Sequence, residues 1–310
     1  MARTEKFSLV IPVRNGGGLF LECIRAVLKQ SLQPAEILIF DTESTDGAVE
    51  NAKPLLAKNK PRYFKVLKSE FDHGGTRNAA LHAARHPWVL YLTQDAVPAD
   101  ERAFAELLGA AMQKGVVAAY GKQLPHADAR PLAATARAFN YGDVRLLQDM
   151  AHAPFLGIKT WFASNSFCVW HKQALLKAGG FAEKLILGED MHAAARLIQA
   201  GAAVAYEPRA HVRHSHNYSA LEEFRRYFDI GVFHSLHAAL LFRAGNANKE
   251  GFKFVLGQAA ALLRDQSYWS LLKLPFHVAA KFLGYKLGRK YTLLGKRFSR
   301  RLSMHKNYWN

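Results

Sequence analysis

Over the first hundred residues, short apolar runs alternate with longer runs whose apolar positions recur at helical spacing. The short runs are rich in β-branched and aromatic residues, and they read SLVIPV, EILIFD, YFKVL and WVLYLT. The helical patterns lie over 19–31, 48–58 and 78–86. Strand, polar loop and helix repeated in this order predict an α/β fold, with a mostly parallel sheet and helices on both faces. Ligands bind such sheets at the carboxyl ends of the strands, where Asn15, Asp41 and Asp95 follow.

Beyond these repeats the pattern is mixed and then becomes helical. A helix is predicted over 103–113, strands at VVAAYG and NSFCVW, and a further helix after the Gly-Glu-Asp sequence that ends at Asp190. From Tyr218 onward the chain is aromatic, basic and helical in pattern. We therefore expect one compact domain over 1–216 and a basic helical C-terminal region over 217–310.

Composition places the chain among globular proteins of a reducing compartment. Its 310 residues are 50% hydrophobic, which is enough for a sizeable core. Cys23 and Cys168 sit in apolar runs without metal-type spacing, so both are expected to be buried thiols. The first residues lack the apolar stretch of a secretory signal, and no run is long enough to span a bilayer. The sequence therefore predicts a cytoplasmic protein.

The charge is large and uneven. The formal net charge is +17, and no Asp or Glu follows Asp265. Such a tail favours a polyanionic partner, either nucleic acid or anionic lipid. From Lys281 onward, apolar and aromatic residues interleave with Lys and Arg, which favours docking on an anionic membrane surface. A nucleic-acid-binding protein is the weaker alternative, because no such motif appears and the basic residues lie away from the strand-end loops.

Several segments together resemble a known family. SLVIPVRNGG, FDTESTDG, LTQDAVP and GEDMHAAARLIQAG are similar, in this order, to the signature stretches of the family 2 inverting glycosyltransferases, which have the GT-A fold. FDHGGTRN, LTQDA and HSHNYS resemble its rhamnosyltransferase-like branch, whose usual donor is dTDP-L-rhamnose. The match covers roughly the first 235 residues. It implies a nucleotide-sugar-binding half over 1–100 and an acceptor-binding half over 101–216.

The resemblance assigns a set of residues to the donor. Asp41 is implied to hold the nucleotide base, with an Asx-turn as the alternative role for an acid at this place. Arg77 is implied beside the diphosphate, where its planar fork suits phosphate. Gly74 would let the backbone approach the ligand, and Asp72 and His73 would contact the sugar or shape its pocket. The full donor set is Pro12, Arg14, Asn15, Asp41, Asp72, His73, Gly74, Arg77, Gln94 and Asp95.

A divalent metal, Mg²⁺ or Mn²⁺, is implied as cofactor. Related enzymes carry Asp-x-Asp where this chain has Thr93-Gln94-Asp95, so only the second acid is present. One Asp can still bridge a metal and a diphosphate. Members of the fold often add a histidine after the acceptor region; His214 is chosen here, and His216 remains open.

The resemblance makes Asp190 the general base, and Glu189 and Trp161 are expected at the acceptor; Trp161 is chosen because aromatic side chains with polar neighbours suit stacking on sugar rings. A carboxylate at a helix start is expected to stay ionised at neutral pH and so to take a proton from an acceptor hydroxyl. Trp161 would line the acceptor pocket, although a buried aromatic is the alternative. A nucleotide-sugar-binding protein without catalysis is a further alternative, against which the intact Asp190 argues.

The function that these residues imply is transfer of L-rhamnose from dTDP-L-rhamnose to a hydroxyl of a glycan or lipid-linked saccharide, in cell-surface polysaccharide synthesis. The alternative within this class is another donor, a UDP-hexose or UDP-N-acetylhexosamine. The expected location is peripheral, on the inner face of the cell membrane, with no nucleic-acid partner.

Overall fold

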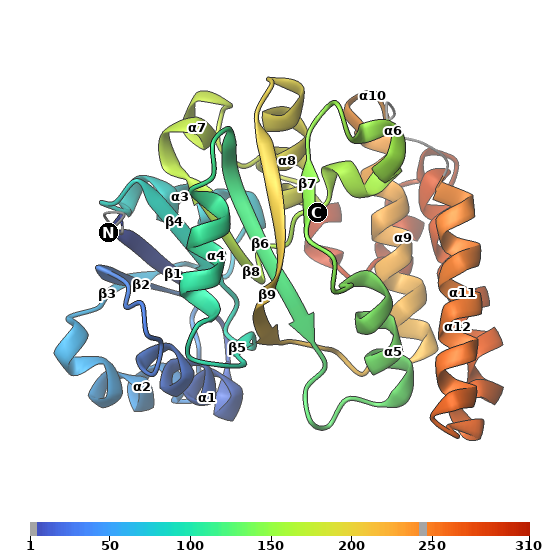
Figure 1. Cartoon of the computed structure of the whole chain (residues 1–310). Coiled ribbons are helices and arrows are strands. Elements are labelled where there is room, and N and C mark those ends of the chain that lie inside the picture. Colours follow the sequence, from blue (N-terminus) through green and yellow to red (C-terminus); the bar gives the residue numbers. More distant parts are fainter. Residues whose placement is uncertain (1–4, 242–246) are drawn as a thin grey trace.

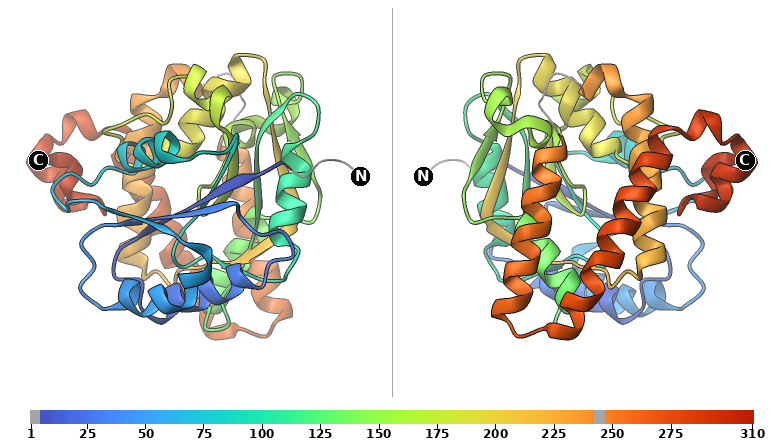
Figure 2. Two further views of the ribbon diagram at one scale, coloured as in Figure 1. Left: turned by 90° about the vertical axis from the view of Figure 1, so that its left-hand side faces the viewer. Right: turned by 90° about the vertical axis from the view of Figure 1, so that its right-hand side faces the viewer.

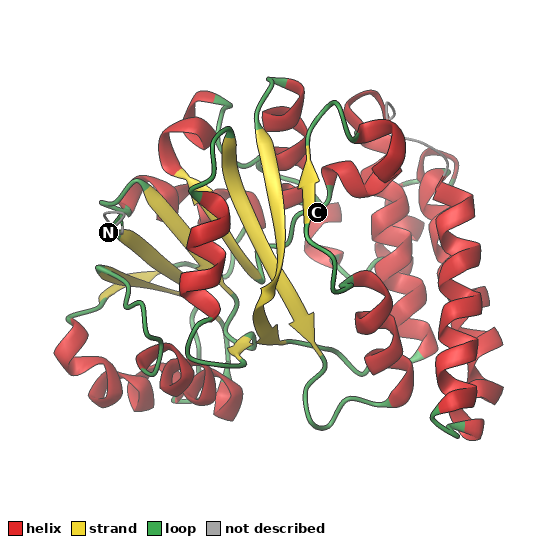
Figure 3. Ribbon diagram, in the orientation of Figure 1, coloured by secondary structure: helices red, strands yellow, loops and turns green. Residues whose placement is uncertain are grey.

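The computed structural model of the protein describes residues 5–241 and 247–310. It confirms the predicted α/β architecture, with helices on both faces of one nine-stranded sheet (Figures 1 and 3). The strands are β1 Phe7–Val13, β2 Glu36–Asp41, β3 Arg62–Lys65, β4 Trp88–Leu92, β5 Val97–Pro98, β6 Val116–Leu124, β7 Leu146–Gln148, β8 Phe167–His171 and β9 Ala203–Arg213.

The sheet is mostly parallel, as the repeats predict. Its order is β3-β2-β1-β4-β8-β6-β9-β5, with β7 paired to β9. The first four strands are parallel to one another, and β6 is parallel to β9. β8 runs antiparallel between β4 and β6. Consequently β1, β2, β4, β6 and β9 all end at one edge of the sheet, and the polar loops that follow them meet there.

Two apolar layers hold the helices against the sheet. On one face lie α1 Gly17–Leu28, α2 Ala48–Leu56, which continues into η1 Ala57–Asn59, and α4 Ala103–Ala111. On the other face lie α3 His73–Ala83, α7 Lys172–Lys177, α8 Glu189–Gln199 and α9 Ala220–Leu236. In α1 the buried residues recur at helical spacing, Phe20, Cys23, Ile24 and Val27. Cys23 and Cys168 are both buried and unpaired, as expected.

The structure differs from the sequence-based prediction in two places. No strand or helix is predicted over 140–163, yet after α5 Pro131–Asn140 this stretch contains β7, the short helix α6 Ala153–Leu156 and the 3-10 turn η2 Gly157–Trp161. Helix α3 begins at His73 rather than at Asn78, because Asp72 caps it by accepting a hydrogen bond from the Gly75 amide.

The C-terminal region is helical, as predicted, and forms the outer layer beyond α9 (Figure 1). None of the helices within the described residues combines the length and the apolar character that crossing a bilayer requires. The elements after α9 are α10 Ala238–Leu241, α11 Ala247–Arg264, α12 Tyr268–Arg289, η3 Tyr291–Leu293, α13 Lys296–Leu302 and η4 Lys306–Trp309.

Glycines let α12 pack closely against α9. A Cβ atom at Gly288 would fall 2.0 Å from the Phe228 carbonyl oxygen, and one at Gly284 would fall 2.3 Å from the Phe224 carbonyl oxygen. Gly231 of α9 faces the backbone of α12 in the same way. No larger residue fits these positions without moving one helix, so the glycines allow the close contact that holds α12 against α9.

After α12 the chain returns toward α3. Asp229 of α9 is fully buried, and its Oδ2 accepts hydrogen bonds from the Met304 and His305 amides at 2.9 and 3.0 Å. The His305 ring then lies 5.5 Å, centre to centre, from the His73 ring at the start of α3. Figure 2 shows this final segment, in red, projecting at one side of the molecule beyond the end of α12.

We expect Gly288→Ala to destabilise the protein by about 1–3 kcal/mol, since the added methyl group overpacks the α9–α12 contact. Thermal unfolding measures the effect. The matched control is Gly109→Ala in α4, where nothing lies within 4 Å of the added atom; it should stabilise by about 0.5–1 kcal/mol, because alanine loses less backbone freedom on folding. Equal melting temperatures for the two variants would contradict the packing account.

Candidate active site

The loops after β1 and β4 are joined by a side chain. Gln94 accepts a hydrogen bond from the Arg14 amide through Oε1 at 2.6 Å and donates one to the Arg14 carbonyl through Nε2 at 3.1 Å. Both polar atoms of Gln94 are thus used on the backbone. Gln94, the residue directly before Asp95, therefore fixes the loop at the end of β1, where Pro12 and Arg14 lie.

The loops after β1 and β2 are joined in the same way. The Asn15 amide donates to Ser44 Oγ at 2.9 Å, and its Oδ1 accepts from the Thr45 amide at 2.8 Å. Asp41 Oδ1 accepts from the Ser44 amide at 3.1 Å, which is the Asx-turn considered as an alternative. Within the described residues its Oδ2 makes no recorded hydrogen bond. Asp41 therefore forms the turn and still offers an acceptor to a ligand.

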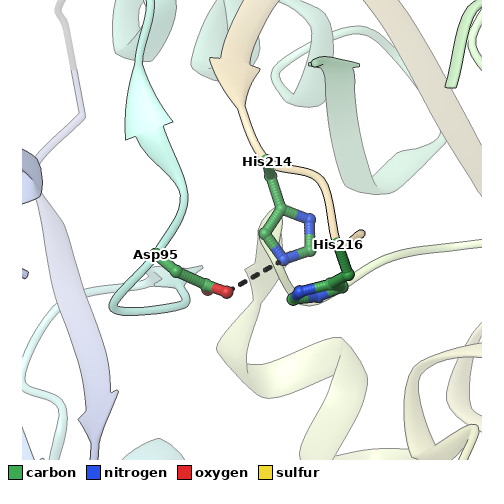
Figure 4. Close-up of side chains that lie close together, drawn as sticks. All are labelled: Asp95, His214 and His216. Carbon is green, nitrogen blue, oxygen red and sulfur yellow. Dashed lines mark ion pairs between the residues drawn. The ribbon is translucent and has the colours of Figure 1, made fainter. Parts of the chain in front are cut away.

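Asp95, His214 and His216 come together at the edge where β4 and β9 end (Figure 4). One ligand atom from each lies within 4.8 Å of the others, and His214 Nε2 is 3.5 Å from Asp95 Oδ2. The prediction selected Asp95 and His214 and left His216 open. The structure brings all three side chains together.

The tautomer of His214 follows from its neighbour. Its Nδ1 lies 2.8 Å from Gln123 Oε1, which also receives a hydrogen bond from Arg137 Nη1 at 2.5 Å. Gln123 Nε2 in turn donates to Ser164 at 2.9 Å. Because a carbonyl oxygen only accepts, His214 carries its proton on Nδ1. The lone pair on Nε2 therefore points toward Asp95, which is the arrangement of a metal-binding histidine with its outer partner in place.

The protonation of the three groups suits a cation. Burial lowers the pKa of His214, and burial followed by the charge of its neighbours lowers the pKa of His216 to about 4. Burial alone would raise the pKa of Asp95, but the hydrogen bond and charge of His214 outweigh it and lower that pKa overall. Two neutral imidazoles and a carboxylate are ordinary ligands of a divalent ion, so these residues fit one.

Glu189 and Asp190 occupy the first turn of α8, behind Gly188, which has a left-handed φ of 80°. Glu189 is 5% exposed and forms an ion pair with the nearly buried Arg77, with Nε 3.3 Å from Oε1. Asn165 Nδ2 donates to the same Oε1 at 3.2 Å. Although burial opposes ionisation, the Arg77 charge, then His73 and this hydrogen bond lower the pKa of Glu189. Glu189 and Arg77 thus neutralise each other's charge. The sequence-based prediction placed Glu189 at the acceptor and Arg77 beside the diphosphate; in the structure each is the ion-pair partner of the other.

Asp190 has the opposite titration behaviour. Its Oδ2 accepts from the Asn165 amide at 3.0 Å and its Oδ1 from the Met191 amide at 2.8 Å. Burial, followed by the negative charge of Glu189, raises the pKa of Asp190 to about 7. The helix start alone was expected to keep this carboxylate ionised at neutral pH; burial and a like charge oppose the helix dipole and raise the pKa instead.

The sequence FDHGGTRN has a structural role that its glycines did not reveal. A Cβ atom at Gly74 would fall 2.0 Å from the Ala182 carbonyl oxygen. Asp72 Oδ1 accepts from the Lys184 amide at 3.1 Å, while its Oδ2 caps α3. Asn78 exchanges two hydrogen bonds of 2.8 Å with the Phe181 backbone. Asp72 and Gly74, predicted to approach the donor, instead seat α3 against the 180–184 segment that leads to Glu189 and Asp190.

Trp161 does not reach the site. It is fully buried, and its Nε1 donates to the Leu241 carbonyl at 3.0 Å. Its ring presents no surface to an acceptor, so it packs as a core aromatic, which was the alternative interpretation.

The structure adds residues that the motifs did not single out. Asn165 donates hydrogen bonds to both Glu189 and Asp190, and Gln123 orients His214. The His305 ring lies beside the His73 ring. Arg226 of α9 lies over the Tyr218 ring, 5.8 Å from its centre. Asn165, Gln123 and His305 lie far along the chain from their partners, whereas Arg226 follows Tyr218 closely in the sequence. No motif in the sequence indicated these contacts.

Comparison with known proteins is consistent with this geometry. Residues 8–178 match the family described as Glycosyl transferase family 2. The chain is 42% identical over 306 residues to the O-antigen chain rhamnosyltransferase WbaN of Salmonella anatum, covering 98% of this chain and 96% of that protein. The same values hold for the O-antigen chain rhamnosyltransferase RfbN of Salmonella typhimurium.

Solved structures share the fold. The mannosyltransferase PcManGT from Pyrobaculum calidifontis, in complex with GDP-Man and Mn²⁺, superposes with a TM-score of 0.57 at 18% identity, covering 99% of this chain and 86% of that one. S. aureus TarS 1-349, in complex with UDP-GlcNAc, gives a TM-score of 0.56 at 14% identity, covering 98% of this chain and 89% of that one.

We expect Mn²⁺ to raise the melting temperature of the wild-type protein, because an ion that binds only the folded state stabilises it. Asp95→Asn and His214→Ala should each abolish most of this rise, since each removes a ligand. Differential scanning fluorimetry with and without the ion measures it. His82→Ala, which removes an exposed histidine of α3, is the control and should keep the full rise; a full rise in Asp95→Asn would exclude the site.

Proposed function

Because this chain belongs to glycosyl transferase family 2, we propose that it transfers L-rhamnose from dTDP-L-rhamnose, with inversion, to a hydroxyl of a lipid-linked saccharide in the synthesis of a cell-surface polysaccharide. The observation that carries the sugar and the pathway is the 42% identity, over 98% of the chain, to two proteins named O-antigen chain rhamnosyltransferases. The geometry of Asp190 and of the Asp95–His214–His216 cluster supports the chemistry.

Asp190 is the general base of this proposal. Its carboxylate takes the proton of the acceptor hydroxyl while that oxygen bonds to the anomeric carbon, and the bond from that carbon to the diphosphate oxygen breaks. The products are the glycoside and dTDP, and the proton stays on Asp190 until solvent removes it. A base whose pKa is about 7 is well matched to this step at neutral pH. A diphosphate leaves without protonation, so no second carboxylate is needed as an acid.

The diphosphate would meet positive charge at the edge of the sheet. A divalent ion, when bound by Asp95, His214 and His216, supplies charge to the leaving diphosphate. Two imidazoles favour Mn²⁺ over Mg²⁺, which prefers oxygen ligands. Arg137 and Arg226 lie close enough to His216 to lower its pKa further. We assign to Arg137 and Arg226 the positive charge that the protein itself offers to the diphosphate, since the charge of Arg77 is paired with Glu189.

We place the nucleoside and the sugar against the loops that follow β1, β2 and β4 and against the start of α3. Asp41 Oδ2 is the acceptor for the base or ribose, and the Asn15 and Gln94 hydrogen bonds hold the loops around it. His73 and His305, with rings 5.5 Å apart, form a wall beside Glu189 that suits the sugar. Its two residues come from the start of α3 and from the C-terminal segment.

We also infer that α12 docks the enzyme on the anionic inner face of a membrane. Trp269, Leu272, Phe276 and Leu283 lie within about 60° of one another around the helix. Trp269 and Phe276 are each 71% exposed. Exposed basic residues accompany them, Lys273, Lys286 and Lys290. An exposed apolar face beside basic residues is typical of helices that lie in a membrane interface.

We expect the protein, supplied with Mn²⁺ and an acceptor, to release nucleoside diphosphate faster from dTDP-L-rhamnose than from UDP-glucose, UDP-galactose or UDP-N-acetylglucosamine. Asp190→Asn should lower kcat by about 10²–10⁴-fold, as expected for loss of a general base. Faster turnover of a UDP-sugar would instead support the alternative donor, and an undiminished Asp190→Asn variant would remove Asp190 from the mechanism.

The pH profile of the same reaction tests the role of Asp190 more sharply. The base works only when ionised, so kcat/KM should fall as the pH drops below about 7. Glu189→Gln removes the like charge that raises the pKa of Asp190, so this limb should move to lower pH. Glu70→Gln, at an exposed position, should leave the limb in place.

We expect the protein to co-sediment with phosphatidylglycerol vesicles more than with phosphatidylcholine vesicles. Trp269→Ser combined with Phe276→Ser should weaken this binding about tenfold or more, since two large apolar side chains no longer enter the interface. The control combines Phe155→Ser and Leu221→Ser, which removes exposed apolar side chains elsewhere. Equal loss in both double variants would contradict docking through α12.

A further inference from the structure

A second basic feature lies apart from the strand-end loops. Arg297, Arg300, Arg301 and Lys306 line a pocket of about 490 Å³ formed by α13 and the start of η4. The three arginines fall within about 100° of one another around α13, while Ser299, on the opposite side, is fully buried. We call this feature the C-terminal basic pocket.

The four cations of this pocket are not neutralised by the protein. Within the described residues none of them takes part in a recorded ion pair, and the sequence carries no acid after Asp265. Like charges gathered in one hollow repel each other unless an anion joins them. Clustered arginines present planar forks that match phosphate oxygens in pairs.

The pocket is tied to the active site by chain connectivity. Lys306 follows His305 directly, and the His305 amide is fixed by Asp229. The His305 ring lies against His73, whose following turn carries Arg77, the partner of Glu189. An anion in the pocket would therefore sit near the wall to which the proposed mechanism assigns the sugar.

The same C-terminal segment also carries exposed apolar side chains. Leu293 is 80% exposed, and Phe298, which directly follows Arg297 in the sequence, is 49% exposed. Upstream lies the exposed apolar face of α12. Phosphate-binding groups beside exposed apolar ones fit an amphiphile that has a phosphorylated head and a hydrocarbon tail, and fit free nucleic acid poorly.

We propose that the C-terminal basic pocket binds the phosphate or diphosphate group of the lipid-linked acceptor. This assignment rests on the proposed function for the identity of the acceptor. The pocket holds the phosphorylated head while the attached saccharide extends toward His305 and Asp190, and the lipid lies along the apolar face. The C-terminal segment thereby selects acceptors that carry a lipid phosphate.

The test is direct binding of farnesyl diphosphate, a short prenyl diphosphate, to the full-length protein by isothermal titration calorimetry in the absence of donor. We expect it to bind at least tenfold more tightly than inorganic pyrophosphate, and farnesol not to bind measurably. Arg300→Gln combined with Arg301→Gln should raise the Kd for farnesyl diphosphate at least tenfold. Lys58→Gln combined with Lys114→Gln removes the same charge at exposed sites elsewhere and should leave the Kd unchanged.

Three results would overturn the proposal. These are an unchanged Kd in the Arg300→Gln/Arg301→Gln variant, equal affinity for pyrophosphate and farnesyl diphosphate, and an equal loss of binding to phosphatidylglycerol vesicles, which would indicate a general anionic-lipid surface. An unchanged melting temperature shows that the variant is folded. Because the measurement uses neither donor nor transfer, a protein that binds farnesyl diphosphate but transfers no rhamnose would refute the proposed function alone.

Discussion

The buried ion pair between Arg77 and Glu189 is the interaction on which the site depends. Both side chains are almost fully removed from water, and each would carry a large desolvation penalty alone. Removing one partner of such a pair typically costs about 3–5 kcal/mol, because the other charge is left uncompensated. The pair joins α3 to the first turn of α8. The whole seam between these helices, including the close contact at Gly74 and the Asn78 hydrogen bonds, brings the two charges to 3.3 Å.

The same pair separates the titration of two adjacent acids. Glu189 has a cation beside it and stays ionised, whereas Asp190 has burial and a negative neighbour and holds its proton more tightly. Two carboxylates whose environments push their pKa values apart are a common way to prepare one of them for proton transfer. Glu189 thus contributes through its charge, and Asp190 is the carboxyl group whose pKa lies near neutral pH, as the proposed base requires.

The fold and part of the site could be predicted because they depend on local order in the sequence. The strand, loop and helix repeats set the edge at which Asp41 and Asp95 appear, and the Gly-Glu-Asp sequence correctly placed Asp190 at the start of a helix. What sequence could not supply were contacts between distant elements. Gly74 is a glycine because Ala182 lies against it, and Asp190 has a raised pKa because the surrounding core is dry. Neither the Gln123–His214 contact nor the His73–His305 contact produces a residue spacing from which it could be predicted.

The C-terminal region shows why these distant contacts matter for function. Glycines on α9 and α12 bring these two helices into close contact, and buried Asp229 fixes the amides of the segment that follows α12. Arg226 and His305, which both belong to this region, therefore reach the site from the opposite direction to the motifs of the sheet. Asp229 fixes this segment beside the proposed active site. If the apolar face of α12 docks on a membrane as proposed, the segment cannot move independently of the membrane or of the site. In the proposed mechanism, a lipid-linked acceptor would arrive at the C-terminal region, and Asp190 would deprotonate it. The contacts of this region therefore connect the place of arrival to Asp190.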